Sequence, residues 1–394
     1  MPPHQSLVVF SHLRWNFVHQ RPQHLLTRLA AGRQVLYVEE PERDDSGPRW
    51  ERRRAAPNVT VYRPMTPSPE PGFHPDQLAA ILPLLPQLLA EAGRHPVAWV
   101  YTPQALPLVE RLDPLAVVYD CMDELSLFLG APAELVARED ALLERADLVF
   151  TGGRSLYRAK RHRHRNIHCF PSSVDADHFG RARPRRPAGV REAEPADQAG
   201  IPHPRLGFFG VIDERIDLSI VAGAADAHPE WQIIMLGPVV KIDPALLPRR
   251  PNIHYPGPRS YGELPAYLAG WDVCLLPFAR NDATRFISPT KTLEYMAAER
   301  PIVSTPITDV AEPYGDIVYL GSTPAEFVAA CEAALGEEPG EHVRRVGRMR
   351  EVLAGTSWDA TAEHMERLVT EAVRRNRHEA QPERNTLSHA TQVQ

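Results

Sequence analysis

Short runs of apolar residues alternate along the chain with longer stretches in which apolar residues recur every three or four positions. The short runs predict buried strands, and the longer stretches predict amphipathic helices. Strands that alternate with helices are typical of an α/β fold with parallel sheets. In the first half we expect strands at 7–10, 35–38, 59–62, 98–101, 116–119 and 148–151, and helices at about 22–31, 75–92, 133–146 and 154–161.

A second series of the same kind begins at Arg205. We expect its strands at 205–210, 231–236, 253–255, 273–276, 302–304 and 317–319, and helices at 261–268, 289–298 and 324–335. The text between the series, rich in Arg, Pro, Ala and Gly, predicts a linker. The predicted organisation is a first domain (1–178), a linker (179–204), a second domain (205–356), a final helix (357–375) and a disordered polar tail (376–394).

Composition narrows the class of protein. The 394 residues suffice for two domains, and 43% hydrophobic with 24% charged residues is typical of a globular protein. A formal net charge of −6 argues against nucleic acid as a partner. The chain enters its first strand almost at once and has no apolar run long enough to span a bilayer, and its four cysteines lack metal-type spacing. These features together predict a cytoplasmic protein.

The segment Arg285–Ala298 carries the clearest chemical signal. Ser288 is a good N-cap and Pro289 a good first helical residue, so free N–H groups beside Lys291 form an anion site. Glu294 lies one turn further on, on roughly the same face. A basic helix start with a deeper carboxylate suits the diphosphate and the sugar hydroxyls of a nucleotide sugar. The alternative is an ordinary surface pair of Lys291 and Glu294.

This segment, Ser-Pro-x-Lys-x-x-Glu-Tyr-Met-Ala, resembles the donor-binding signature of GT-B glycosyltransferases, especially the family-4-like group. The resemblance implies two Rossmann-like domains with parallel sheets that face each other across a cleft. It assigns Glu294 to the ribose of the donor. The family often carries a second glutamate, separated from this one by seven residues, and this chain departs from that pattern with Phe286 at the matching position. The residues expected to bind the donor diphosphate are Gly210, Arg215, Arg285, Ser288, Thr290 and Lys291.

Gly210 ends a predicted strand and lets backbone approach a phosphate, and Arg215 could reach the same group. Many relatives carry a basic residue directly after this glycine, where this chain has Val211. For Arg215 a surface salt bridge with Asp213, Glu214 or Asp217 is the competing interpretation. We assign the binding of the nucleotide base to the loop after the strand expected at 253–255, which contains Gly257, Arg259 and Ser260.

Several polar residues follow the first predicted strand. Polar side chains at the end of a buried strand cost free energy to bury, so we expect them to have a function there. They resemble the opening of bacterial cell-surface glycosyltransferases with an Arg-Pro-Gln-His-Leu helix start, which faces the cleft. We place His12 in the catalytic centre and the others on the acceptor side: Trp15, Arg21 and His24. For His24 a helix residue satisfied by backbone is an equal alternative.

Three carboxylates close another first-domain strand, which fits a general base for a hydroxyl acceptor. We assign the base to Asp120, and Asp123 and Glu124 to the acceptor side, although the last two could merely cap a helix. The resemblance implies no bound metal and no cofactor, because Arg215, Arg285, Lys291 and the helix dipole would neutralise the diphosphate.

The basic stretch Arg158–Arg165 leaves open a peripheral contact with the inner membrane surface or a lipid-phosphate acceptor, but a solvated helix end is favoured. The predicted activity is transfer of a sugar from a nucleotide diphosphate sugar to a hydroxyl acceptor, which could be a glycan, a lipid-linked sugar or a small molecule. Resemblance favours retention of configuration, whereas a base at Asp120 favours inversion. The alternatives are a GT-B-type sugar-nucleotide epimerase and a non-catalytic binding protein.

Overall fold

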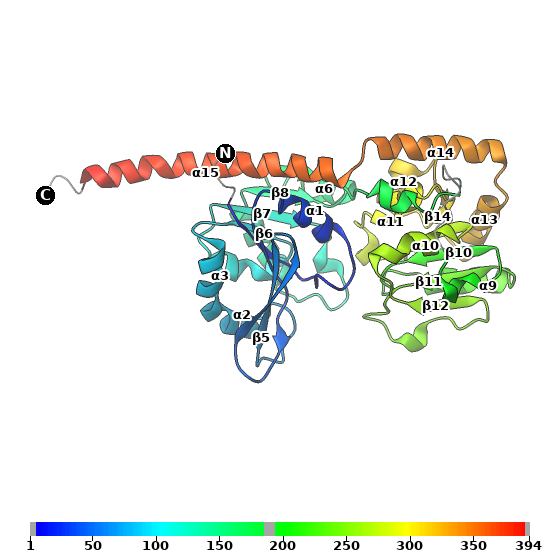
Figure 1. Ribbon diagram of the computed structural model, residues 1–394, viewed down its shortest axis with the longest axis horizontal. Helices are drawn as coiled ribbons and strands as arrows, with labels where there is room; N and C mark the ends of the chain where they lie inside the picture. The colour runs from blue at the N-terminus through cyan, green and yellow to red at the C-terminus, as the bar shows by residue number, and fades with distance from the viewer. Residues whose placement is uncertain (1–4, 185–193, 391–394) are drawn as a thin grey trace.

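Two α/β domains lie side by side in the computed structural model, which describes residues 5–184 and 194–390 (Figure 1). The strands of both are nearly continuous apolar runs, because helices cover both faces of a parallel sheet. In the described residues the N-terminal sheet has nine strands, in the order β3-β5-β2-β1-β6-β7-β8-β9 with β4 beside β5. They are β1 (Leu7–Phe10), β2 (Val35–Val38), β3 (Glu42–Arg43), β4 (Arg49–Ala56), β5 (Val59–Thr66), β6 (Val97–Val100), β7 (Ala116–Cys121), β8 (Leu148–Thr151) and β9 (Ile167–Cys169).

Two apolar clusters fill the N-terminal domain, one on each face of its sheet. Helices α2 (Pro75–Ile81), α3 (Leu85–Ala92), α4 (Leu106–Val109) and α5 (Leu135–Arg145) cover one face, and α1 (Arg21–Leu29) covers the other with the last helix of the chain. The helix predicted for 75–92 is divided at Leu82–Leu84, where Pro83 interrupts it with a turn of 3₁₀ helix.

The C-terminal sheet is entirely parallel, in the order β12-β11-β10-β13-β14-β15. Its strands are β10 (Arg205–Phe209), β11 (Gln232–Leu236), β12 (Ile253–Gly257), β13 (Val273–Leu276), β14 (Ile302–Ser304) and β15 (Tyr319–Leu320). Its helices are α9 (Leu218–Ala227), α10 (Leu264–Ala269), α11 (Thr290–Ala297), α12 (Thr308–Tyr314), α13 (Pro324–Leu335) and α14 (Pro339–Ala354). The strand predicted at 317–319 begins two residues late, since Ile317 and Val318 instead complete the turn after α12.

The expected parallel sheets hold except for β4, which runs antiparallel to β5. The sequence of β4, Arg-Trp-Glu-Arg-Arg-Arg-Ala-Ala, has no alternation of apolar residues, because most of its side chains face solvent. Backbone bonds to β5 hold the strand, and charged side chains at the edge of a sheet discourage further pairing. Such a strand carries no hydrophobic signal for sequence analysis to detect.

The predicted linker is partly ordered. Phe179, on α7 (Ala176–Gly180), and Ala182 are fully buried in the core of the C-terminal domain. Gln198, on α8 (Ala196–Ala199), donates to the carbonyl of Tyr267 at 3.0 Å. Residues 185–193 lie outside the described part of the chain.

The final helix, α15 (Trp358–Ala390), returns across the N-terminal domain and extends past it (Figure 1). Trp358 and Met365 pack into the N-terminal core, and Asn376 donates to the carbonyl of Leu115 at 2.9 Å. The backbone is helical as far as Ala390, so the disordered tail predicted from 376 is wrong over that range. Residues 391–394 lie outside the described part. Among the described helices, none combines the length and apolar character that a bilayer crossing requires.

Candidate active site

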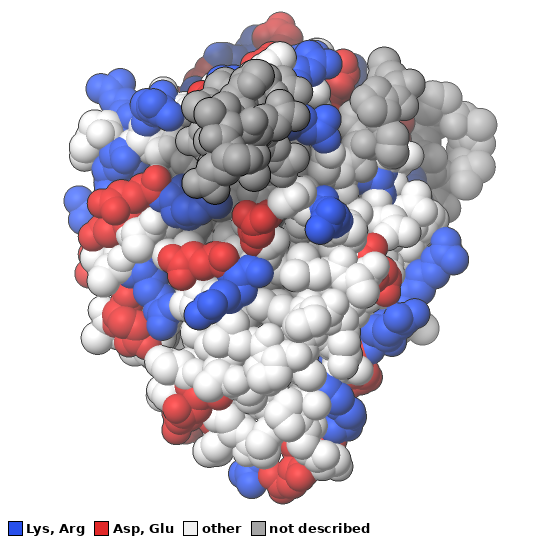
Figure 2. Space-filling view, turned by 90° about the vertical axis from the view of Figure 1, so that its left-hand side faces the viewer, with Lys and Arg blue, Asp and Glu red and all other residues white. Residues whose placement is uncertain are grey.

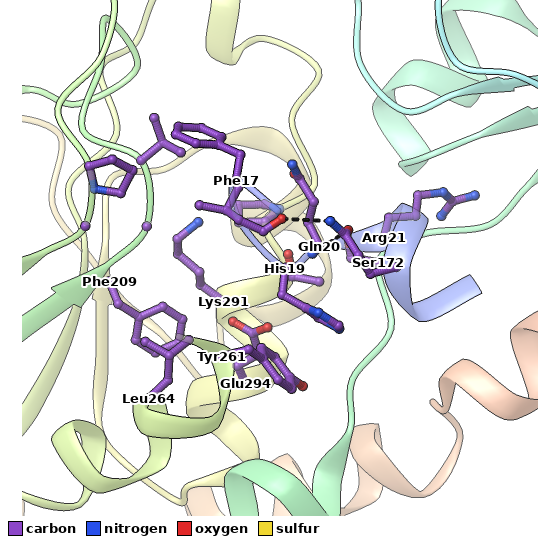
Figure 3. A pocket seen from close by; sticks show the side chains of 18 of the residues that line it. Phe17, His19, Gln20, Arg21, Ser172, Phe209, Tyr261, Leu264, Lys291 and Glu294 are labelled. Atoms are coloured by element: carbon purple, nitrogen blue, oxygen red, sulfur yellow. Dashed lines mark hydrogen bonds between the residues drawn. The ribbon is translucent and has the colours of Figure 1, made fainter. Parts of the chain in front are cut away.

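A cavity of about 560 Å³ lies between the two domains, within the size range of small-molecule sites. The loop after β1 forms one wall, and the loops after β10, β11 and β12 with the start of α11 form the other (Figure 3). Both walls contain the carboxyl ends of parallel strands, which is where open α/β sheets bind ligands.

Lys291 and Glu294 lie one turn apart on α11 and both line the cavity. Figure 3 shows the two side chains reaching into the same space, opposite the loop that carries His19 and Gln20. Neither side chain makes a hydrogen bond or an ion pair within the part of the chain that the structure describes. The predicted pair is therefore on the cavity and available to a ligand, and is not an exposed surface pair.

Burial dominates the electrostatics of this pair. It raises the pKa of Glu294 to about 7, although the ammonium of Lys291 pulls it down. Burial also lowers the pKa of Lys291, an effect that Glu294 opposes and Arg215 strengthens. A desolvated ammonium beside the first turn of a helix is a strong attractor for a ligand anion.

Two glycines allow the backbone to approach this lysine. Gly210 has φ +139°, and a Cβ there would lie 2.2 Å from Cε of Lys291. Gly237 has φ +148°, and a Cβ there would lie 1.9 Å from the carbonyl oxygen of Gly210. Both conformations favour glycine. Any side chain at Gly210 would displace Lys291 from the cavity.

The start of α11 differs from the prediction. Pro289 occupies the N-cap position and Thr290 is the first helical residue, so Ser288 is not the cap. Ser288 and Thr290 both line the cavity, and the carbonyl of Ser288 accepts a hydrogen bond from Oγ of Ser172 at 2.7 Å. Ser288 thus connects the start of α11 to the segment that leaves the N-terminal domain.

Arg285 is not part of this cavity. Its exposed guanidinium lies 5.2 Å above the ring of Phe286 and does not line the space, so its predicted contact with the diphosphate is wrong. The 3₁₀ turn Asp282–Thr284 directs Arg285 outward. Phe286, at the position where the family often has an acid, packs against the apolar core of the N-terminal domain.

Arg215 lines the cavity but is also paired. Its Nε and Nη2 donate to the carboxylate of Asp213, with Nη2 at 2.6 Å, so the predicted salt bridge and the predicted location are both present. In the loop expected to bind the nucleotide base, Arg259 and Ser260 line the cavity, whereas Gly257 is the last residue of β12 and lies outside the lining. The guanidinium of Arg259 is fully engaged by Asp197, Tyr267 and two backbone carbonyls.

Asp120 is buried in the N-terminal domain, whose wall of the cavity we call the acceptor wall, and it does not line the cavity itself. Its carboxylate accepts from Nη2 of Arg21 at 2.9 Å and from Nε at 3.2 Å. Nη1 of Arg21 donates to the carbonyl of Phe170 at 2.8 Å. The expectation that Asp120 lies in the cleft without a core partner is wrong, because Arg21, 99 positions earlier, is that partner.

Asp123 lies at the cavity where Asp120 was expected. Its carboxylate has no hydrogen bond or ion pair with the residues that the structure describes. Burial raises its pKa, whereas the charges of Arg215 and Arg21 lower it. Glu124 is instead held 2.6 Å from Nζ of Lys160, so it anchors the loop and does not face the cavity.

The remaining predicted residues of the first wall divide in the same way. Trp15 lines the cavity, and its backbone N–H donates to Oε1 of buried Glu39 at 2.7 Å. His12 lies outside the lining, with Nδ1 buried and unpartnered among the described residues, and burial lowers its pKa to about 4. His24 is buried against Trp358 of α15, with ring centroids 4.8 Å apart, so it has a packing role.

Sequence analysis missed an aromatic stack at the cavity rim. The ring of Tyr261 lies between His19, at 4.3 Å, and His178, at 4.2 Å. Burial is the main cause that lowers the pKa of His19 to about 4. The three rings come from distant parts of the chain, so only the polar loop before Arg21 could have drawn attention to His19.

A polar contact joins the domains beside the cavity. Helix α6 (Arg154–Lys160) of the N-terminal domain follows Gly153, which has no side chain to cap it. Oδ1 of Asp309, from α12 of the other domain, accepts from the N–H of Ser155 at 2.9 Å. Nη1 of Arg158 also lies 2.7 Å from Glu312.

The basic stretch 158–165 is largely neutralised within the protein. Lys160 is buried between Glu124 and Glu139, and Arg163 pairs with Asp140. On the face that Figure 2 shows, Lys and Arg are interspersed with Asp and Glu around a broad uncharged area. The solvated helix end that the sequence favoured does not describe Lys160, which is buried between two carboxylates inside the protein.

Comparison with known proteins finds similarity to glycosyltransferases. Residues 203–337 match the family Glycosyl transferases group 1. The putative teichuronic acid biosynthesis glycosyltransferase TuaH of Bacillus subtilis (strain 168) is 25% identical over 288 residues, which cover 68% of this chain and 70% of the relative.

Solved structures resemble the whole chain. Sucrose-phosphate synthase from Thermosynechococcus elongatus superposes with a TM-score of 0.70 at 14% identity, over 93% of this chain and 99% of that one. A structure titled trehalose-6-phosphate from E. coli, bound with UDP-2-fluoro glucose, gives a TM-score of 0.65 at 13% identity, over 94% and 99%. Residues 203–337 are therefore similar to the group 1 glycosyltransferases, and the chain as a whole has the two-domain GT-B fold expected from its sequence.

Proposed function

We propose that the protein transfers a sugar from a nucleotide diphosphate sugar to a hydroxyl acceptor in the cavity between its domains. The observation that carries the proposal is the pair Lys291 and Glu294, both available to a ligand on the cavity. Lys291 and the first turn of α11 would bind the diphosphate and stabilise it as the leaving group. Glu294 would accept hydrogen bonds from the ribose. The group 1 domain covers this wall, which supports the assignment.

On the opposite wall we propose Asp123 as the group that takes the proton from the acceptor hydroxyl. Its raised pKa makes the carboxylate a better base than an exposed aspartate. The name of the Bacillus relative, a putative teichuronic acid biosynthesis glycosyltransferase, supports a role in polysaccharide biosynthesis. We propose that the acceptor is a glycan, a lipid-linked sugar or a small molecule. We propose a cytoplasmic location, with no cofactor and no metal.

The direct test is to incubate the full chain with a panel of nucleotide sugars and candidate acceptors and to follow nucleotide diphosphate release. Acceptor-dependent release supports a transferase. Conversion of the donor sugar without an acceptor would indicate the epimerase, and binding without turnover would indicate a non-catalytic protein.

Lys291→Ala should weaken the binding of the preferred nucleoside diphosphate by about 10- to 100-fold, because one charge-assisted contact is lost. Isothermal titration calorimetry with UDP, GDP and ADP measures this loss. Arg285→Ala is the matched control, since it removes an exposed cation outside the cavity and should leave affinity unchanged. Equal affinities of Lys291→Ala and the wild type would contradict the assignment.

Nucleoside diphosphate affinity should fall as the pH drops below about 7, by up to about tenfold per unit. The pKa of Glu294 is raised to about 7, so below that pH a proton must leave before the carboxylate can accept from both ribose hydroxyls. Glu294→Gln should lose this dependence. Ionisation of the diphosphate itself is common to both proteins, so the difference between their pH profiles isolates Glu294, and parallel profiles would exclude it.

A further inference from the structure

The positive charges at the cavity are unevenly available to a ligand. Within the described part of the chain, four Lys and Arg residues contribute to the lining: Arg21, Arg215, Arg259 and Lys291. All nitrogen atoms of two of these guanidinium groups are already committed inside the protein, to Asp120 and Phe170 for Arg21 and to the contacts of Arg259 described above.

The uncommitted cationic groups belong to the second domain. They are Nζ of Lys291 and Nη1 of Arg215, which have no hydrogen bond among the described residues and lie on the donor wall. Lys241, also from that domain, lies outside the lining, 3.9 Å from Glu214 and 5.2 Å from the ring centroid of Phe128. His19 is neutral near pH 7 because its pKa is lowered to about 4.

The acceptor wall, which the N-terminal domain forms, carries negative rather than positive charge. Arg21 and Asp120 cancel each other, which leaves the unpaired carboxylate of Asp123 as the net charge of that wall. The lining of the cavity on the side of the N-terminal domain also includes the aromatic residues Trp15 and Phe17 and the amide residues Asn16 and Gln20. Aromatic faces with neutral amides and a carboxylate offer stacking surface and hydrogen-bond acceptors for hydroxyl groups.

We infer that the part of the acceptor that enters the cavity is a neutral, hydroxyl-bearing sugar ring without a phosphate or a carboxylate. An anion on that ring would meet Asp123 on a wall whose described lining residues supply no uncommitted cation of their own, whereas recognition of phosphate calls for available Arg or Lys donors. This distinguishes the chain from the solved neighbours named sucrose-phosphate and trehalose-6-phosphate synthases, whose names specify phosphorylated products. The inference rests on the proposed function and adds the charge class of its acceptor.

The test first identifies, by calorimetry on the full chain, which of UDP, GDP and ADP binds. If none of them binds, the proposed function itself fails. The nucleotide-saturated protein is then titrated with the 6-phosphates of glucose, galactose, mannose and N-acetylglucosamine. The same four sugars, as neutral methyl glycosides and as 6-phosphates, are supplied with the matching nucleotide sugars in transfer assays.

We expect no saturable binding of the sugar phosphates to the wild type, and transfer to any neutral glycoside at least about tenfold faster than to its 6-phosphate. Asp123→Lys should gain sugar-phosphate binding by about tenfold or more, while Asp123→Asn, which removes the charge without reversing it, should gain less. Nucleotide binding by both variants serves as the folding control.

Three results would overturn the inference while leaving the proposed function intact. The first is saturable binding of a sugar phosphate to the nucleotide-loaded wild type. The second is faster transfer to a 6-phosphate than to its neutral partner. The third is a nucleotide-binding Asp123→Lys variant that gains no affinity for any sugar phosphate, because the charge at this position would then not face the acceptor.

Discussion

Asp123→Asn should lower the rate of sugar transfer by about 100- to 10,000-fold, the range over which a general base contributes to catalysis. The substitution keeps the size of the side chain and removes only its ability to accept the proton. Since the residues proposed to bind the nucleotide, Lys291 and Glu294, belong to the other domain, the affinity for nucleoside diphosphate should stay within about twofold of the wild type. Steady-state kinetics combined with calorimetry separates the two quantities.

Glu124→Gln is the appropriate control for Asp123→Asn, because Glu124 neighbours it in the chain but contacts Lys160 and not the cavity. Its effect should be on stability, with a smaller loss of rate in the folded protein. Full activity of Asp123→Asn would exclude the carboxylate as the base. A collapse of rate in Glu124→Gln alone would transfer the role to that residue.

Asp120→Asn should destabilise the protein by about 3–5 kcal/mol, because it leaves the cation of Arg21 buried without its counter-ion. The side chain of Arg21 is only 6% exposed and that of Asp120 is fully buried, so water cannot replace the lost partner. The free energy of unfolding from urea titrations, monitored by circular dichroism, measures the loss.

Asp45→Asn provides the matched control for Asp120→Asn, since it breaks an exposed pair with Arg43 and should cost at most about 1 kcal/mol. The double variant Arg21→Met/Asp120→Leu should recover much of the stability, because it removes both buried charges. A stable Asp120→Asn protein that has lost its activity would instead return Asp120 to the chemistry.

The fold was largely predictable because its information is local. Strands such as β1 and β10 are continuous apolar runs that only a sheet covered on both faces can bury. The strand β4 had no such signal, because its residues face solvent and its partner supplies only backbone bonds. The extent of α15 was missed for a related reason, since polar text is equally compatible with an exposed helix and with disorder.

The site was predictable where a single element creates it. Lys291 and Glu294 share one helix, so their spacing alone places both on the same face, and in the structure that face lines the cavity. The pairing of Arg21 with Asp120 depends on the start of helix α1 meeting the end of strand β7, 99 positions further along the chain, and no local pattern encodes it. The outward direction of Arg285 likewise follows from a short turn and from the contact of Phe286 with the other domain.

The contact between Asp309 and the N–H of Ser155 has a consequence for motion. A hydrogen bond that caps the start of a helix stabilises it by about 1 kcal/mol. Here Asp309 of the C-terminal domain supplies this bond to α6 of the N-terminal domain. Opening the cavity therefore frays the first turn of α6. The last residue of that helix, Lys160, holds Glu124 beside Asp123, so separation of the domains loosens the base on the acceptor wall. Such coupling would tie the proposed proton transfer to closure of the cavity.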